Sequence, residues 1–458
     1  MTWREAFHIF SRLGSRRPET GPPESPVPGL VALVFRSPQA LPPDPDATPT
    51  EVVPAMSDAA RTPVIVSGAR TPIGRFLGGL SPLDAPELGA LAAKAAVERS
   101  GVPGEEIDEV ILGNVVQGGV GQAPARQAAI RSGLPATIPA LTVNKVCGSG
   151  LKAVMLAAQA IRAGDVRAVV AGGFESMSNV PYFLPGLRNG LKFGDRKLVD
   201  GLIHDGLWCA FGQCHMGGHA EYTAAKAGIT REEADAFALS SHQKAVDAID
   251  AGRFAAEIVP VEIQGRKGSV IIDTDESPRR ETSMEALGRL RPAFPQDAPD
   301  DIEDLVVTAG NAPGLNDGGA ALVVTSLEFA QAHGLEVKAH ITGYASGGTE
   351  PRDLFFAPIT AVRRLMDRAG TEIGDYDLFE VNEAFAVQAI ADMRGLEMDP
   401  ERVNVNGGAV ALGHPIGCSG ARVLITLLYA MEDRDLRTGL ATLCLGGGNA
   451  VALSVERR

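Results

Sequence analysis

A cysteine stands where the sequence predicts a tight turn followed by a helix. Cys147 lies in the stretch 144–151, NKVCGSGL, in which Gly148 and Gly150 interrupt a strand and an apolar helical pattern begins at Leu151. Backbone N–H groups and the positive end of the helix dipole are expected to face the sulfur, and both favour the thiolate. This position indicates a nucleophile, although one cysteine at a helix start is more often a small buried core residue.

Three later blocks carry further chemistry. His414 lies in a glycine-rich turn before another helix (406–417, NGGAVALGHPIG), Cys444 precedes a run of glycines (442–448, TLCLGGG), and Asn382 follows an apolar run (381–385, VNEAF). A histidine that titrates near neutrality can take the proton of a thiol, and a thiolate exchanges readily with thioesters. Together these residue types indicate acyl transfer through a covalent cysteine intermediate.

The four blocks, in this order and spacing, resemble the thiolase family, and they are most similar to its acetyl-CoA acetyltransferase branch. The resemblance runs from about Pro63 to the C-terminus. It implies reversible condensation of two acetyl-CoA to acetoacetyl-CoA plus coenzyme A, by a ping-pong mechanism. Coenzyme A thioesters are then the substrates, and neither a cofactor nor a metal is expected.

The resemblance also implies a role for each catalytic residue. Cys147 carries the acetyl group, His414 takes its thiol proton, and Cys444 removes a proton from the second acetyl thioester. His414 and a water held by Asn382 form one oxyanion site, and the backbone N–H groups of Cys147 and Gly446 form the other. Contacts with the substrate or with coenzyme A are expected from Leu207, His215, Met216, Arg279, Phe294 and Phe385.

Other positions depart from the family pattern or have no role in it. Pro313 replaces a serine that is expected near the pantetheine arm, and Ala286 replaces a serine near the adenine. Leu354, Phe355 and Phe356 replace a Met/Gly-rich run beside the acyl pocket, which leaves acyl length open between acetoacetyl-CoA and longer 3-ketoacyl-CoA substrates. Cys209, Cys214 and Cys418 are expected to be structural.

Two other functions compete with this interpretation. A ketosynthase-like condensing enzyme of the same fold would use one cysteine with two histidines, and the Cys444 block argues against it. An inactive thiolase-like protein that binds lipids would be expected to have lost Cys147, Asn382, His414 or Cys444, and all four are present.

Alternating short β-rich runs and helical patterns predict an α/β fold. Helices are expected at 87–100, 151–163, 231–251, 359–369 and 420–430, and strands at 64–66, 110–112, 169–170, 322–324, 378–379 and 451–453. The resemblance implies two duplicated α/β halves stacked as five αβαβα layers with an inserted loop domain. The expected boundaries are an N-terminal half at 59–178 and 314–335, an inserted coenzyme A-binding loop domain at 179–313, and a C-terminal half at 336–458.

Composition sets limits on the remaining properties. The formal net charge of −14 argues against non-specific nucleic-acid binding, and five cysteines favour a reducing compartment over a disulfide framework. No apolar run is long enough for a transmembrane helix, and we expect a cytoplasmic homodimer or homotetramer. Residues 1–58 are rich in proline and predicted to be disordered, and the sequence leaves open whether 1–55 is an extension, a targeting segment or a misplaced start before Met56.

Overall fold

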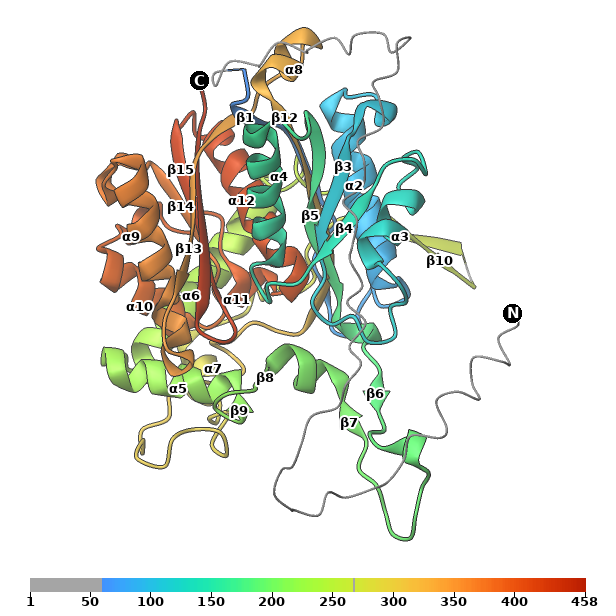
Figure 1. The fold of residues 1–458 in the computed structure, drawn as a ribbon. Helices are drawn as coiled ribbons and strands as arrows, with labels where there is room; N and C mark the ends of the chain where they lie inside the picture. The colour runs from blue at the N-terminus through green and yellow to red at the C-terminus, as the bar shows by residue number, and fades with distance from the viewer. Residues whose placement is uncertain (1–59, 267) are drawn as a thin grey trace, which may run out of the picture. The chain divides into compact units, whose positions relative to one another are not determined.

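The structure is a computed structural model that describes residues 60–458 except Lys267. The predicted disorder of residues 1–58 lies outside the described residues. Two sets of strands, one from each predicted half, build the centre of the molecule (Figure 1).

The first set has the order β4-β3-β5-β12-β1. Its strands are β1 (Pro63–Arg70), β3 (Glu109–Gly113), β4 (Ala140–Val143), β5 (Ala168–Ser176) and β12 (Asn316–Ser326), and the two-residue β2 (Gly74–Arg75) pairs with β12. β3 runs parallel to β4 and to β5, whereas β12 is antiparallel to both β5 and β1. A parallel core with antiparallel strands at one side is thus the pattern of this half.

The second set repeats the pattern in the order β14-β15-β16-β13. Its strands are β13 (Ala339–Gly348), β14 (Leu378–Val381), β15 (Thr438–Leu445) and β16 (Asn449–Glu456). β14 is parallel to β15, and β16 is antiparallel to β15 and to β13. β1 and β13 pair over two residues each, so the two sets join into one sheet of ten strands.

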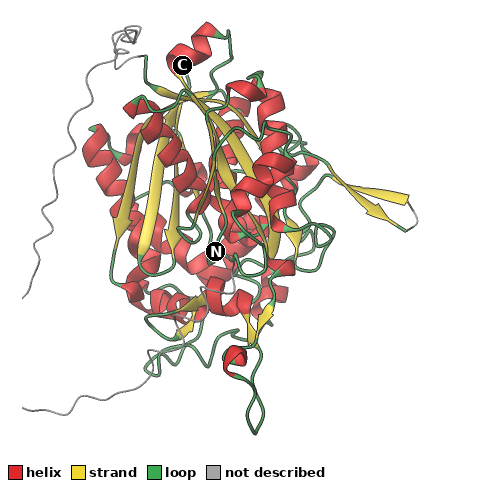
Figure 2. Ribbon diagram, turned by 45° about the vertical axis from the view of Figure 1, so that its right-hand side comes forward, coloured by secondary structure: helices red, strands yellow, loops and turns green. Residues whose placement is uncertain are grey.

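Helices form three layers around these strands (Figures 1 and 2). α4 (Ser149–Ala163) and α12 (Ile416–Asp433) lie between the two sets and contact strands of both. α2 (Ala85–Ser100) and α3 (Pro124–Arg131) cover the outer face of the first set, and α9 (Ala357–Ala369) and α10 (Ala386–Leu396) lie outside the second. The predicted duplicated, five-layer α/β fold is confirmed.

The two central helices approach each other closely at glycines. A Cβ atom on Gly150 would lie 2.6 Å from the backbone nitrogen of Ala421, and one on Gly420 would lie 2.3 Å from that of Leu151. Real Cβ contacts are never so short, so both positions require glycine. The crossing fixes the N-terminal ends of α4 and α12 together, which are the ends that carry Cys147 and His414.

The inserted segment supplies a further group of elements. They are β6 (Tyr182–Phe183), β7 (Val199–Asp200), β8 (Trp208–Cys209), β9 (Cys214–His215), α5 (Met216–Ala227), α6 (Arg231–Asp250), β10 (Val261–Gly265), β11 (Gly268–Ile272) and α7 (Met284–Gly288). Alanines of α5 and α6 pack into the same buried cluster as α9 and α10. Two further short helices are α8 (Leu327–Ala332) and α11 (Ala409–Leu412). The domain boundaries given above remain predictions.

Each predicted helix and strand has an observed counterpart, with different ends. α12 begins at Ile416 rather than at residue 420, and β12 covers eleven buried residues rather than 322–324. β4 is the strand expected to end before the turn at Cys147, whereas β13 and β15 have no counterpart among the expected strands. Among the described residues, no helix is both long enough and apolar enough to cross a bilayer.

Candidate active site

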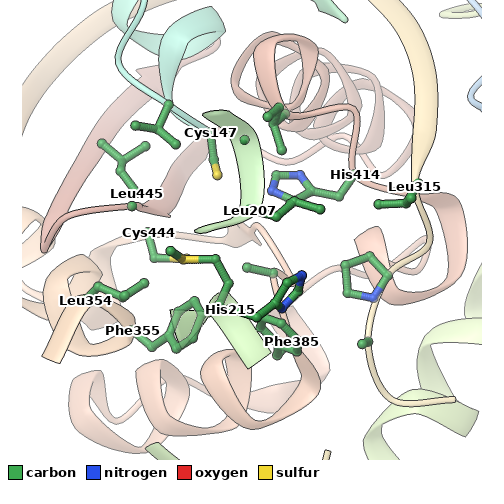
Figure 3. Close-up of a pocket in the computed structure, with 18 of the residues that line it drawn as sticks. Cys147, Leu207, His215, Leu315, Leu354, Phe355, Phe385, His414, Cys444 and Leu445 are labelled. Carbon is green, nitrogen blue, oxygen red and sulfur yellow. The ribbon is translucent and has the colours of Figure 1, made fainter. Parts of the chain in front are cut away.

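A largely apolar cavity of about 290 Å³ lies where the ends of α4, α12, β14 and β15 meet the inserted segment. Figure 3 shows Cys147, His414 and Cys444 facing it from different elements. Of the predicted site residues, those that line it are Cys147, Leu207, His215, Met216, Phe294, Phe385, His414, Cys444 and Gly446. Segments from across the chain therefore converge on one space.

Cys147 is half-buried, directly before the N-cap of α4. Burial raises the pKa of its thiol to about 12, while the backbone N–H groups of Cys147 and Gly446 act to lower it. Burial therefore opposes the effect expected of the helix start and of the two N–H groups, and it is the largest of these contributions. The N–H groups of Cys147 and Gly446, which are expected to form an oxyanion site, thus lie beside the Cys147 sulfur.

The ring of His414 is held in one tautomer. Its Nδ1 lies 2.6 Å from Oγ of Ser419, and that hydroxyl donates to the carbonyl oxygen of Pro415 at 2.9 Å. Since the hydroxyl has a single proton, it accepts from Nδ1–H, which leaves Nε2 as an unprotonated acceptor. Nε2 has no protein partner, and burial together with the charge of Arg422 lowers the pKa of His414 to about 3. His414 is therefore a neutral base at pH 7.

The backbone around His414 is fixed by two buried side chains that sequence analysis missed. Asn316 accepts from the N–H of His414 at 2.9 Å, and Glu175 accepts from the N–H of Gly417 at 3.0 Å. Glu175 also accepts from the N–H groups of Val115 and Val116. Its pKa is raised to about 7 by burial. This carboxyl group ties the first turn of α12 to the loop after β3.

Cys444 and Asn382 lie at the ends of two adjacent parallel strands. The N–H of Asn382 donates to the carbonyl of Thr442 at 3.0 Å, two residues before Cys444. The pKa of Cys444 is raised well above its usual value, first by burial and then by its proximity to Cys147, so the two sulfurs lie near each other. Asn382 is fully buried, is not among the residues lining the cavity, and both of its amide atoms lack a protein partner.

One wall of the cavity is a row of rings in contact with one another. His215 stacks on Phe294 with centroids 4.6 Å apart, Phe385 meets Phe294 edge-on at 6.2 Å, and Phe355 meets Phe385 at 5.4 Å. Leu354 and Phe355 are 1% and 2% exposed and line the cavity (Figure 3). In the sequence they stand out only as departures from the family pattern, and in the structure they form part of the wall.

The remaining predicted residues lie outside the cavity. Arg279 is exposed, and its backbone N–H donates to Nδ1 of His242 at 3.1 Å. Cys418 is buried in the core between the central helices, and Cys209 and Cys214 form part of the β8–β9 hairpin. Across residues 60–266 and 268–458, no group of three or more His, Cys, Asp or Glu side chains could hold a metal ion.

Known proteins are similar to this chain in sequence and in fold. The family profile described as "Thiolase, N-terminal domain" matches residues 63–328, and "Thiolase, C-terminal domain" matches 335–457. An acetyl-CoA acetyltransferase of Pseudomonas aeruginosa is 54% identical over 86% of this chain and 99% of its own length. One from Cupriavidus necator is 53% identical, again over 86% of this chain and 99% of its own.

A crystal structure gives the same result. The acetyl-CoA acetyltransferase of Bacillus anthracis superposes with a TM-score of 0.84 at 42% identity, covering 87% of this chain and 100% of that one. Two family profiles, relatives of more than 50% identity and a matching duplicated fold agree with one another. The chain belongs to the thiolase family.

Proposed function

We propose that this protein is an acetyl-CoA C-acetyltransferase that condenses two acetyl-CoA into acetoacetyl-CoA and coenzyme A, and catalyses the reverse thiolysis. The observation that carries the proposal is the arrangement around Cys147: two backbone N–H groups beside its sulfur, and in the same cavity the unprotonated Nε2 of His414 and the second thiol of Cys444. The names of relatives that are more than 50% identical support the same activity.

The first half-reaction starts from a neutral pair. Because Cys147 is a thiol and His414 is uncharged, the proton moves from sulfur to Nε2 as the sulfur attacks the thioester carbonyl. The N–H groups of Cys147 and Gly446 stabilise the carbonyl oxygen as it gains charge. Coenzyme A accepts the proton from His414 and departs as the thiol. Acetyl-Cys147 remains.

The second half-reaction forms the carbon–carbon bond. Cys444 passes its thiol proton to the neutral Nε2 of His414 and, as a thiolate, removes a proton from the methyl group of a second acetyl thioester; the enolate carbon then attacks the acetyl carbonyl on Cys147. Asn382 supports this step because its buried, unpartnered amide can hold a water that donates to the enolate oxygen. The Cys147 sulfur is displaced, takes the proton back from His414 and becomes the resting thiol, which releases acetoacetyl-CoA.

Each chemical role in this scheme falls to a side chain, a backbone N–H or a water, so the mechanism requires no cofactor. Arg279, outside the cavity, is proposed to meet the nucleotide end of coenzyme A, and Leu207 and Met216 its acyl end. By the family resemblance we further propose a homodimer or homotetramer that works in the cytoplasm.

Acyl length follows from the wall of rings. Leu354, Phe355 and Met216 occupy space that a longer acyl tail would need, so we propose acetoacetyl-CoA as the preferred thiolysis substrate. Each methylene that an apolar pocket excludes changes kcat/KM by roughly 10- to 200-fold.

The test is a thiolysis series from four to sixteen carbons, with Cys147→Ala as the inactive control. We expect kcat/KM to be highest at four carbons and to fall steeply at six. A rise beyond four carbons would instead assign the protein to the broad-range 3-ketoacyl-CoA thiolases. Absence of any thiolysis in the intact protein would overturn the proposed function itself.

A further inference from the structure

Two cysteines face each other in the short hairpin that leads into the cavity wall. β8 and β9 pair antiparallel, with Cys209 directly opposite Cys214 and Trp208 opposite His215 (Figure 1 labels both strands). Directly opposed residues of an antiparallel pair have Cα atoms about 4.5–5.5 Å apart and project to the same face. Disulfides need Cα separations of about 4.4–6.8 Å, so this register meets the distance requirement.

Both sulfurs also come close to one turn residue. The Sγ of Cys209 accepts from the N–H of Gly212 at 3.2 Å, and a Cβ on Gly212 would lie 3.3 Å from the Sγ of Cys214. The turn itself is closed by a hydrogen bond of 2.8 Å from the N–H of Gln213 to the carbonyl of Cys209. The hairpin therefore holds the two thiols on the same side of a tight turn.

The two thiols differ in access. Cys209 is 2% exposed, whereas Cys214 is half-buried and lines a second, surface cavity of about 460 Å³ together with His219 and Tyr222. A cavity of this size admits a small molecule. This cavity is separate from the one that Cys147 lines, and no residue lines both.

We propose that Cys209 and Cys214 form a reversible disulfide, with a low-molecular-weight disulfide such as oxidised glutathione as the oxidant. The Cys214 thiolate attacks one sulfur of the oxidant, which stays bonded to Cys214 in a mixed disulfide, while the other sulfur of the oxidant leaves as a thiolate and takes up a proton. The Cys209 thiolate then attacks the Cys214 sulfur and releases the second small thiol. In sum two protein thiols are oxidised, one small disulfide is reduced to two thiols, and both protons pass to the leaving groups.

The position of the hairpin gives the bond a consequence. Cys214 is followed directly by His215, whose ring stacks on Phe294 in the cavity wall and whose Nδ1 accepts from the N–H of Gly217 at the start of α5. A cross-link one residue before His215 restrains the strand that positions this ring. Burial raises the pKa of the Cys214 thiol, with smaller contributions from Cys209 and Asp297, so the first step should accelerate as pH rises from 7 to 9.

The experiment uses the full chain carrying Cys147→Ser and Cys444→Ser, which removes the two thiols of the active site. The protein is incubated with oxidised glutathione, alkylated under denaturing conditions and mapped by mass spectrometry without reduction. We expect one peptide pair or loop that has lost two hydrogens and joins Cys209 to Cys214, while Cys418 is recovered as an alkylated thiol. Reduction with dithiothreitol should return both cysteines to the alkylated form.

Single variants test the order of the two steps. Cys209→Ser should accumulate glutathione on Cys214, because the resolving thiol is missing, whereas Cys214→Ser should accumulate little, because Cys209 is buried. A mixed disulfide that persists on Cys214 while Cys209 is intact would overturn the proposal, as would two free thiols after full oxidation. In an otherwise unchanged chain, both variants should retain thiolysis activity, which verifies that they fold.

Discussion

Ser419 is the residue whose removal tests the chemistry of His414 most sharply. Its hydroxyl lies 2.6 Å from Nδ1 of His414 and is itself anchored on the carbonyl of Pro415. Ser419→Ala deletes the acceptor for Nδ1–H and leaves the rest of the cavity unchanged. The ring then loses the contact that keeps the proton on Nδ1 and the free electron pair on Nε2.

The magnitude follows from burial. His414 is 7% exposed, so an Nδ1–H without a partner costs roughly 1–3 kcal/mol. The ring can avoid that cost by shifting its proton to Nε2, which removes the base from Cys147, or by rotating away. Either route reduces the population that is able to react, and we expect acylation to slow by roughly 10- to 100-fold.

The assay is single-turnover acetylation of Cys147 by acetyl-CoA, followed by rapid quench. Ser419→Thr keeps a hydroxyl and should recover most of the rate. Thr426→Val is the matched control, because it also removes a buried hydroxyl from α12. The Thr426 hydroxyl contacts Glu257 at 3.3 Å and does not contact His414. The reasoning is refuted if Ser419→Ala acetylates within twofold of the unchanged protein, or if Thr426→Val slows acetylation equally.

Three further predictions concern the general base, the acyl pocket and a buried carboxyl group. Cys444→Ser should retain acetylation of Cys147 but lose condensation by about a hundredfold or more, because a general base is removed; condensation near the original rate would contradict that role. Phe355→Ala should raise kcat/KM for six-carbon relative to four-carbon thiolysis by roughly tenfold or more per methylene, whereas Phe356→Ala, outside the cavity lining, should not. Burial raises the pKa of Glu380 from 4.5 to about 8. Between these pH values the folded protein holds a proton that the unfolded chain has lost, so the free energy of unfolding falls as pH rises from 4.5 to about 8. Glu380→Gln should therefore raise Tm at pH 9 relative to the unchanged protein more than at pH 5, and an equal difference at both pH values would show that Glu380 does not titrate there.

The chemistry-bearing residues could be predicted because each lies in a short local pattern. Cys147, His414 and Cys444 all stand beside glycine-rich turns, and the structure brings these turns to one cavity. The contacts that tune them could not be predicted in this way. Glu175 reaches Gly417 across 242 positions of sequence, and no local pattern reports such a pairing.

The protonation state of the nucleophile is the clearest example. A helix start predicts a lowered pKa for Cys147, but burial raises the pKa by a larger contribution. That burial depends on the inserted segment and the second half packing over the same turn. The strand β13 was missed because its position also depends on packing between distant segments. β13 contains Gly343, Gly347 and Gly348, which weaken a strand pattern, and it is held in place by pairing with β16.

The central claim is that acetyl transfer passes through Cys147. The most direct measurement is mass spectrometry of peptides from the full chain quenched shortly after mixing with acetyl-CoA. The account predicts one acetyl group on the peptide that contains Cys147, absent from Cys147→Ser and retained in Cys444→Ser. An acetyl group found on Cys444 alone, with Cys147 unmodified, would contradict it.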